Sequence, residues 1–458
     1  MLTESDLKSA LGEAMAGGGD FAEIFVERRQ INSISMEAQR IEQVVTGVDV
    51  GAGIRVLSGE SSVYVFTNDL SNQGVRLAAH TASQAASRCE HGSRKVISLA
   101  AGKKVATAVI QEADMGAKVA VVKEAEKEAR SGGENIRQVM VRYGDTEQLV
   151  QIANSEGRLA EDRRFRTIFV VNVVAADGNN VQTGYESLGG TQGLDLLTPD
   201  VVRNLASQAT RRALMLLKAQ PAPPGRMPVV LSGEAGGTMI HEACGHGLEA
   251  DIVGKEMSVY AGKRGQRVAS ELVTVIDDPT LPGKYGSYHF DDEGTPTQRN
   301  VLISHGVLQT YMTDLDWARR LGQAATGNGR RQSFHYPPIP RMSNTYVAPG
   351  EMLPEEIIAQ THRGLLVKKM GGGQVNPTTG DFVFDVAEGY LIENGKITVP
   401  VRGATLSGNG PAALMTVDMV GIDLGFAIGT CGKDGQGVPV SDAQPTMRIP
   451  ELVVGGLL

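Results

Sequence analysis

Residues 220–225 read QPAPPG, and this stretch divides the chain of 458 residues into two parts of different character. Proline has no backbone N–H and is not tolerated inside a helix, so the three prolines at 221, 223 and 224 end the element before them. Proline clusters of this kind are typical of linkers. We therefore place a domain boundary at residue 224.

The part before this linker alternates between helical and strand patterns. Apolar residues at helical spacing predict helices, and alternation of apolar and polar residues between glycines predicts antiparallel strands. A polar turn is expected around residues 102–104. The expected elements are a helix over 1–16, strands between Phe21 and Val56, helices over 75–89 and 114–142, strands over 148–187, and a helix over 199–219.

The part after the linker shows short strands and glycine-rich turns. Its clearest signal is a hairpin over 389–399, in which Asn394-Gly395 supplies the positive φ values of a type I′ turn. We predict an α+β protein: an N-terminal helix-on-antiparallel-sheet region, then a large β-rich C-terminal domain carrying the metal-site helix described below. The expected domains are 1–110 and 111–224, both α+β, and 225–458.

Composition narrows the class of function. The 44 basic and 52 acidic residues give a net charge of −8, which is no footprint for nucleic acid. The first 20 residues do not resemble a signal peptide, and no stretch approaches the roughly 18 apolar residues of a membrane span. Three cysteines form no disulfide framework and indicate a reducing compartment. We expect a cytoplasmic protein that binds neither membranes nor nucleic acid.

Residues 241–246, HEACGH, hold two of the eight histidines of the chain. In the common zinc-peptidase motif the histidines are four residues apart and lie within about 40° of each other on a helix. His241 and His246 are five apart, which a regular helix would separate by about 140°. We therefore predict a π-type bulge near Cys244 to His246, or a helix end there, made easier by Gly245. Alternatively, these are helix histidines that form only hydrogen bonds.

Glu242 follows the first histidine and suits a general base that takes a proton from a water activated by zinc. A catalytic zinc normally has three protein ligands, so a third must be found. The candidates from the residues alone are Cys431, Cys244, Glu249 and Asp251. Cys244 would share a helix face with His241 if no bulge formed, but a lone helix cysteine is usually a small buried hydrophobe. Cys431 lies in a glycine-rich loop in which Lys433 could favour the thiolate.

Two stretches carry a resemblance to a known family. HEACGHGLEAD at 241–251 and GTCGKDGQGVPV at 429–440 resemble the TldD branch of the TldD/PmbA family. The resemblance runs from about Phe21 to the end of the chain. Further similar stretches are DDEGTP at 291–296, PRMSNT at 340–345, GGGQV at 371–375 and GDFVF at 380–384.

The resemblance implies a zinc metallopeptidase of the HExxxH type, with His241, His246 and Cys431 as zinc ligands and Glu242 as the general base. It further implies a cytoplasmic dimer that encloses its active sites, either a homodimer or a heterodimer with a TldE/PmbA-like subunit. The expected substrates are unfolded or small peptides. An extended peptide would pair with a strand edge flanked by Gly371 to Gly373, although these glycines also suit an ordinary turn.

The remaining glycine, histidine and acidic motifs do not indicate a further functional site. The glycines before His241 lack the Lys-Ser/Thr ending of a phosphate-binding loop, so nucleotide binding is not expected. His289 and His335 receive no role, and the acidic run 291–293 is expected in a turn or at a rim. The alternative function is a non-catalytic regulatory or chaperone-like partner that keeps the fold without needing Glu242.

Overall fold

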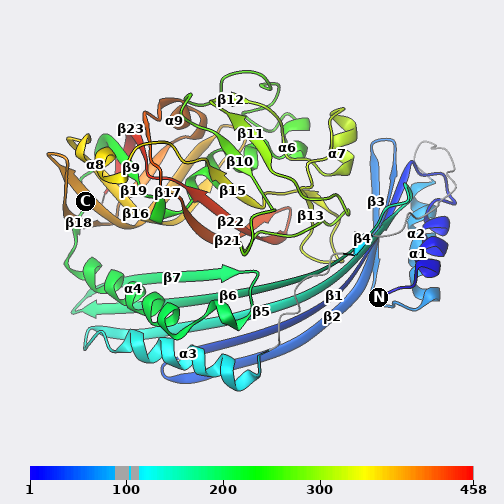
Figure 1. The fold of residues 1–458 in the computed structure, drawn as a ribbon, viewed down its shortest axis with the longest axis horizontal. Helices are drawn as coiled ribbons and strands as arrows, with labels where there is room; N and C mark the ends of the chain where they lie inside the picture. The colour runs from blue at the N-terminus through cyan, green and yellow to red at the C-terminus, as the bar shows by residue number, and fades with distance from the viewer. Residues whose placement is uncertain (88–102, 105–112, 457–458) are drawn as a thin grey trace.

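The structure is a computed structural model that describes residues 1–87, 103–104 and 113–456. It is an α+β protein in which a long curved sheet lies against a β-rich C-terminal part (Figure 1). Cys89, the last two residues of the predicted helix 75–89, and Gly102 of the predicted turn lie outside the described residues. Among the described residues, no helix is long and apolar enough to cross a membrane.

The first sheet contains seven strands in the order β3-β2-β1-β5-β6-β4, with β7 also paired to β6. Its pairings are antiparallel except for the short β4. The longest strands have 19 residues and so extend for about 60 Å at 3.3 Å per residue. The strands are β1(Phe21–Glu37), β2(Arg40–Ser58), β3(Ser61–Thr67), β4(Lys103–Lys104), β5(Ile136–Asn154), β6(Leu159–Asp177) and β7(Asn180–Gly190).

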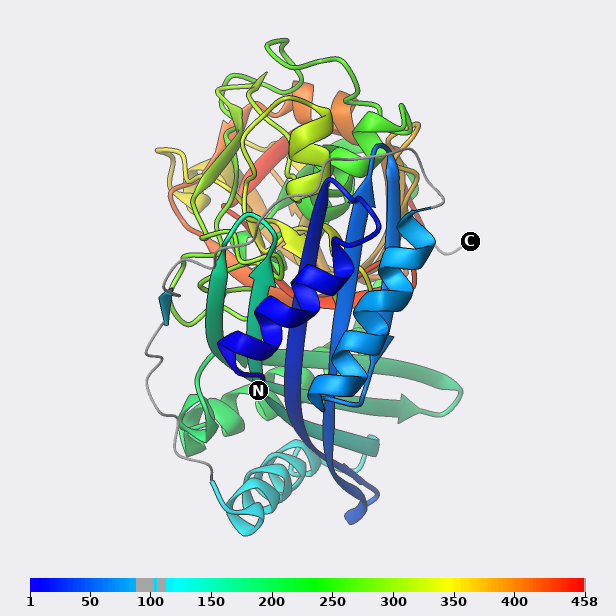
Figure 2. The same ribbon diagram turned by 90° about the vertical axis from the view of Figure 1, so that its right-hand side faces the viewer.

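Four helices cover the outer face of this sheet (Figures 1 and 2). Because successive side chains in a strand point to opposite faces, Ile24 and Val26 pack outward against the first pair of helices, while Val139 and Val141 pack against the second. The first pair is α1(Glu4–Ala14) and α2(Asn72–Ala86), and the second is α3(Met115–Arg130) and α4(Pro199–Lys218).

The predicted helix over 114–142 is wrong in its second half. Helix α3 ends at Arg130, and residues from Ile136 onward belong to β5. Gly133 has a φ of 109°, a conformation that only glycine adopts easily, so the chain turns there. The predicted helices at 1–16 and 199–219 and the strands after Phe21 are confirmed, the strands as two long ones.

The C-terminal part contains two larger sheets. In the eight-stranded one, β16-β9-β23-β19-β17 closes on itself because β16 also pairs with β17, and β18 and β8 extend it. Its strands are β8(Gln220–Pro221), β9(Gly225–Leu231), β16(Arg363–Val375), β17(Asp381–Glu393), β18(Lys396–Arg402), β19(Thr405–Asn409), β20(Met419–Val420) and β23(Met447–Gly455). The predicted hairpin joins β17 to β18, and both Asn394 and Gly395 have positive φ.

The six-stranded sheet has the order β12-β11-β10-β15-β22-β21. Its strands are β10(Val275–Asp277), β11(Asn300–Ser304), β12(Val307–Leu308), β15(Asn344–Val347), β21(Gly425–Lys433) and β22(Gln436–Gln444). A smaller pair is formed by β13(Gly329–Arg330) and β14(Ile339–Pro340). The helices of this part are α5(Thr238–Ile240), α6(Ala250–Gly254), α7(Leu315–Arg320), α8(Pro354–Ala359) and α9(Gly410–Thr416).

Buried ion pairs join the inner face of the first sheet to the C-terminal part. Arg55 contacts both Glu23 and Glu293, and Arg164 lies 2.5 Å from Asp292. The acidic run 291–293 was expected in a turn or at a rim; it is in a turn, but its side chains are buried. Asp292 and Glu293 can be buried here because arginines of the sheet compensate their charge, whereas Asp291 accepts hydrogen bonds from backbone N–H groups.

The division at residue 110 between two N-terminal domains stays a prediction. Strands from both stretches belong to one sheet, since β1 pairs with β5 along 15 residue pairs. Residues 219–224 lie between α4 and β9, with Gln220 and Pro221 pairing with β18 on the way, and the domain boundary at residue 224 also stays a prediction.

Candidate metal centre

The segment with the two histidines is a distorted helix. Helix α5 continues into a π turn over His241–Gly245, followed by a 3-10 turn over His246–Leu248. The backbone N–H of His246 donates to the carbonyl of His241, five residues earlier. The predicted π-type bulge is therefore confirmed, and it returns two histidines of irregular spacing to one side of the segment.

Gly245 is required here by space and not by its backbone conformation. Its φ of −54° is ordinary for a helix. A Cβ at this position would lie 2.1 Å from Sδ of Met342, which is fully buried. Glycine thus lets the π turn pack closely against the segment that follows β14.

Three buried side chains meet beside the π turn: His241, His246 and Cys431. Their possible ligand atoms all lie within 4.8 Å of one another. The Nε2 atom of His246 is 3.5 Å from Sγ of Cys431, and the two imidazole rings are nearly perpendicular, at 89°. Cys431 arrives on β21, whose partner β22 holds the start of α5 through a hydrogen bond from Gly237 N–H to the carbonyl of Asp442.

The electrostatics of this cluster favour a thiolate. Burial would raise the pKa of Cys431, but His241 and His246 outweigh it and lower that pKa to about 4. Burial would lower the pKa of His246, but Glu249 and Cys431 outweigh it and hold that pKa well above the ordinary value. The Nζ atom of Lys433 instead contacts Glu249, Asp251 and the carbonyl of Pro340. The histidines, and not the lysine that the sequence suggested, therefore favour the thiolate.

Glu249 and Asp251 lie next to the cluster but do not belong to it, although both were candidate ligands from the sequence. Glu249 Oε2 accepts a hydrogen bond from Nδ1 of His246 at 3.0 Å and lies 3.1 Å from Lys433 Nζ. Asp251 also binds Lys433, at 2.8 Å. A carboxylate on Nδ1 fixes the imidazole in the tautomer whose Nε2 lone pair is free for a metal.

Cys244 lies away from the cluster. Its Sγ donates to the carbonyl of Ile240 at 3.3 Å, and burial raises its pKa to about 12. The π turn moves the next turn by one residue, so the helix face that Cys244 would share with His241 is not formed. Cys244 is a small buried packing residue of the C-terminal core.

Glu242 and all three residues of the cluster line one cavity of about 400 Å³. Glu242 itself is only partly buried, so its carboxylate is accessible from this cavity. The lining also includes Gly373, Gln374 and Val375. These belong to β16, so the predicted alternative of an ordinary turn at Gly371–Gly373 is wrong.

The donor set fits a zinc ion. Two imidazole nitrogens and one thiolate sulfur are typical ligands of catalytic zinc, which keeps its fourth position open. Nδ1 of His241 is buried without a hydrogen-bond partner among the described residues. A cation held by the cluster would compensate the thiolate charge, and the cavity beside Glu242 leaves room for water and substrate.

Replacing the carboxylate behind His246 should weaken the metal site without removing a ligand. Glu249→Gln is expected to lower zinc affinity about 10- to 100-fold, the usual effect of losing an outer-shell partner. Competition with a chelator measures this affinity. Asp251→Asn is the matched control, since Asp251 contacts Lys433 and not His246. Equal affinities for the two variants would contradict the orienting role of Glu249.

Zinc affinity should rise with pH across the neutral range. The pKa values of His241 and His246 are raised, so in the metal-free protein the imidazoles hold their protons to higher pH than ordinary histidines, and zinc must displace them. Cys431, with its pKa near 4, contributes no such proton above about pH 5. Affinity titrations between about pH 5.5 and 8 should show protons released by histidines alone. A flat profile would contradict these shifts.

A glutamate beside a buried cluster of two histidines and a thiolate defines the class: a candidate metal-dependent hydrolase. Sequence comparison adds the family. The chain matches three consecutive descriptions, "PmbA/TldA metallopeptidase domain 1" over residues 22–86, "central domain" over 110–217 and "C-terminal domain" over 224–456. The protein belongs to the PmbA/TldD family of metallopeptidases.

Relatives of this chain are named as metalloproteases. It is 37% identical to a "Metalloprotease TldD homolog" of Haemophilus influenzae, covering 95% of this chain and 93% of the relative. A "Zinc metalloprotease TldD homolog" of Saccharolobus solfataricus is 29% identical over 96% and 97% of the two chains.

Solved structures confirm the fold. A putative modulator of a DNA gyrase from Thermotoga maritima superposes with a TM-score of 0.81 at 22% identity, covering 99% of this chain and all of the other. TldE from Thermococcus kodakarensis gives 0.79 at 21% identity, covering 98% and 100%. At these identities the likeness concerns the fold alone.

Proposed function

We propose that this protein is a zinc-dependent peptidase in which His241, His246 and Cys431 hold the metal and Glu242 is the general base. The observation that carries the proposal is the convergence of the three possible ligands with Glu242 on one cavity. The family supports metallopeptidase activity in general, and one relative is named a zinc metalloprotease. The roles of single residues in this proposal rest on the geometry of the site and not on the names of relatives.

Zinc bound at this site would polarise the scissile carbonyl and make a water molecule acidic near neutral pH. Glu242 takes the proton of the attacking water and returns it to the leaving amine, which is general acid–base chemistry. Cys431, whose lowered pKa favours the thiolate, would balance part of the metal charge. Glu249 keeps His246 in its ligating tautomer and orientation.

The substrate is an extended, unfolded or small peptide. Near Gly373 to Val375 the strand β16 pairs with β17, whereas its pairing with β9 involves only Leu365 to Val367. The second edge of β16 at Gly373 to Val375 is therefore unpaired among the described strands and faces the metal cavity. A peptide that adds to this edge gains backbone hydrogen bonds with little side-chain preference.

The working assembly in this proposal is a cytoplasmic dimer that encloses its active sites, as a homodimer or with a TldE-like subunit. The structural likeness to a protein named TldE supports a partnership of this type. Enclosure would admit unfolded chains and exclude folded proteins.

The test measures bound metal by elemental analysis together with cleavage of an unstructured peptide pool. The chain is assayed alone and with a TldE-like subunit, before and after chelation, and after zinc is restored. One zinc per chain, with cleavage lost on chelation and recovered with zinc, is expected. Cleavage that persists in the metal-free protein would overturn the proposal. Stable zinc binding without cleavage in either assembly would instead favour the regulatory alternative.

A further inference from the structure

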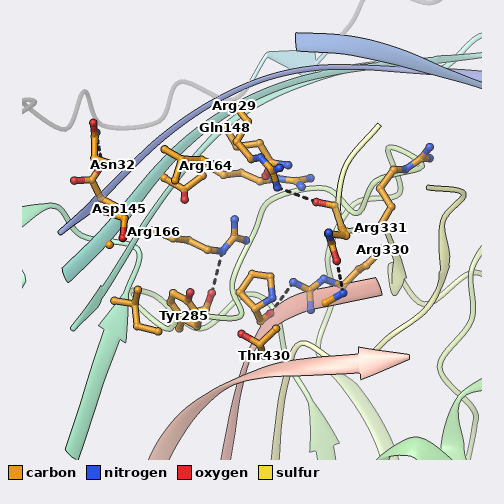
Figure 3. Close-up of a pocket in the computed structure, with 18 of the residues that line it drawn as sticks. Arg29, Asn32, Asp145, Gln148, Arg164, Arg166, Tyr285, Arg330, Arg331 and Thr430 are labelled. Atoms are coloured by element: carbon orange, nitrogen blue, oxygen red, sulfur yellow. Dashed lines mark hydrogen bonds between the residues drawn. The ribbon is translucent and has the colours of Figure 1, made fainter. Parts of the chain in front are cut away.

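A second cavity lies between the inner face of the first sheet and the C-terminal part, with a volume of about 360 Å³ (Figure 3). Five arginines but only two acidic residues line it, in a chain whose net charge is −8. We call it the arginine cavity. The charged lining residues are Arg29, Arg164 and Arg166 from the sheet, Arg330 and Arg331 from the opposite wall, and Asp145 and Asp292.

The acidic residues near this cavity are already engaged. Asp292 pairs with Arg164, which also lies 3.1 Å from Asp162. Asp145 lies 2.6 Å from Nζ of Lys118, on the side of α3. Neither carboxylate of the lining is therefore available to neutralise the remaining arginines.

Two of those arginines, Arg166 and Arg330, have no carboxylate within ion-pair distance in the part of the chain that the structure describes. Arg166 donates instead to the carbonyls of Tyr285 and Ser287, at 3.1 and 3.2 Å. Arg330 donates to two further carbonyls, one of them that of Pro439 at 2.8 Å. Both retain N–H groups for a ligand, since a guanidinium has five.

The charge of these arginines is poorly compensated. Burial, together with the neighbouring Arg164 and Arg330, lowers the pKa of Arg166 to about 10. Burial likewise lowers the pKa of Arg330. Arg330 is buried and Arg166 is partly buried. Cations withdrawn from water without counterions are costly, and an anion that enters the cavity would remove that cost. Figure 3 shows Arg166 and Arg330 extending into the cavity from opposite walls.

The arginine cavity adjoins the metal centre. Thr430 lines both cavities, and the next residue, Cys431, belongs to the metal cluster. Across the β21–β22 hairpin, Thr430 pairs with Pro439, which also lines the arginine cavity. An extended peptide advances about 3.3 Å per residue, so one peptide can run from the metal cavity into the arginine cavity beside it.

We propose that the arginine cavity is a subsite for a carboxylate of the peptide substrate, either its C-terminal carboxylate or an acidic side chain. Arg166 and Arg330 bind it, because planar guanidinium groups match carboxylate oxygens in pairs of hydrogen bonds. The subsite deepens the proposed peptidase function and rests on it. The subsite would make the enzyme prefer peptides with a negative charge at one position. Binding along the strand edge alone would show little preference for sequence.

Binding of three probes to chelator-treated protein tests this without turnover and without a metal to attract carboxylates. The probes are acetyl-tetraalanine as the free acid, its C-terminal amide, and an amidated peptide of the same length with one glutamate. The free acid or the glutamate peptide should bind about 10- to 100-fold more tightly than the neutral amide, the value of charge-assisted hydrogen bonds. Whichever acid is preferred identifies the source of the carboxylate.

Arg166→Gln should bring the acidic probe to the affinity of the amide, while Arg166→Lys should keep part of the difference. Arg163→Gln is the matched control, because this neighbour on β6 does not line the arginine cavity. Thermal unfolding checks that the variants fold, and the comparison of probes on the unaltered chain needs no variant.

Equal binding of acid and amide by the unaltered chain would overturn the subsite, as would a preference that survives in a folded Arg166→Gln variant. Arg166-dependent binding of inorganic phosphate without binding of either acidic peptide would also overturn it. Because none of these readouts involves cleavage, a failed subsite is distinguishable from a failed peptidase.

Discussion

Glu242→Gln should reduce peptide cleavage by about two to four orders of magnitude, the usual contribution of a positioned general base. Glutamine has nearly the same shape but cannot take a proton from water. Glu242 lines the metal cavity without belonging to the buried cluster, so bound zinc should remain at the level of the unaltered chain. The measurement is kcat/KM on an unstructured peptide, together with metal content on the same preparation.

Glu234→Gln is the matched control. This glutamate lies in the short turn before the metal-site segment, and its side chain is 68% exposed. Among the described residues, Lys368 is its one ion-pair partner. Cleavage should be unchanged there. Full activity of Glu242→Gln would refute the general-base role, and its failure to bind zinc would show that Glu242 acts on the metal site itself.

Cys431→Ala should abolish stable zinc binding, and cleavage with it. Loss of an outer-shell partner already costs about 10- to 100-fold in metal affinity, so loss of the thiolate ligand should cost more. The substitution also removes the negative charge that raises the pKa of His241, so this histidine should titrate at lower pH. Elemental analysis after dialysis and competition with a chelator compare the zinc affinity of Cys431→Ala with that of the unaltered chain.

Cys244→Ala separates this effect from the general loss of a cysteine. Both thiols are buried, but Cys244 contacts the carbonyl of Ile240 and not the histidines. Its replacement should cost a small amount of stability and leave zinc binding intact. Retention of zinc by Cys431→Ala would contradict the ligand role of Cys431. Loss of zinc in Cys244→Ala would contradict the packing role of Cys244.

The irregular spacing of the histidines was enough to predict the local backbone. A regular helix cannot bring residues five apart to one side, so any metal pair at 241 and 246 requires an extra residue in the turn. The π turn at His241–Gly245 satisfies that geometry. The reason for Gly245, its contact with Met342, was not predictable because it depends on a segment about a hundred residues away.

The residues alone left the third ligand open among four candidates. Cys431 is 185 residues from His246, and only the pairing of β21 with β22, and of β22 with β15, brings it there. No local pattern contains that topology, and the family resemblance supplied the assignment. Glu249 was one of the open candidates for the third ligand, and the structure instead places it against Nδ1 of His246, a position that its spacing from the histidines does not distinguish from a ligand position.

The charged interface between sheet and C-terminal part was missed. Arg164 and Arg166 alternate on one face of β6, and Glu23 and Glu27 do so on β1. Such period-two charge on otherwise apolar strands is a usable signal of a second, charged interface, but no interface was predicted from it. Similarly, the helix predicted through residue 142 overlooked Gly132-Gly133 as a stop.

The central claim is that His241, His246 and Cys431 together hold one zinc ion. X-ray absorption at the zinc edge of the zinc-loaded protein tests it most directly. The expected first shell contains one sulfur at about 2.3 Å and two imidazole nitrogens at about 2.0–2.1 Å, with an oxygen completing four ligands. A shell without sulfur, or one with two sulfurs, would contradict the claim.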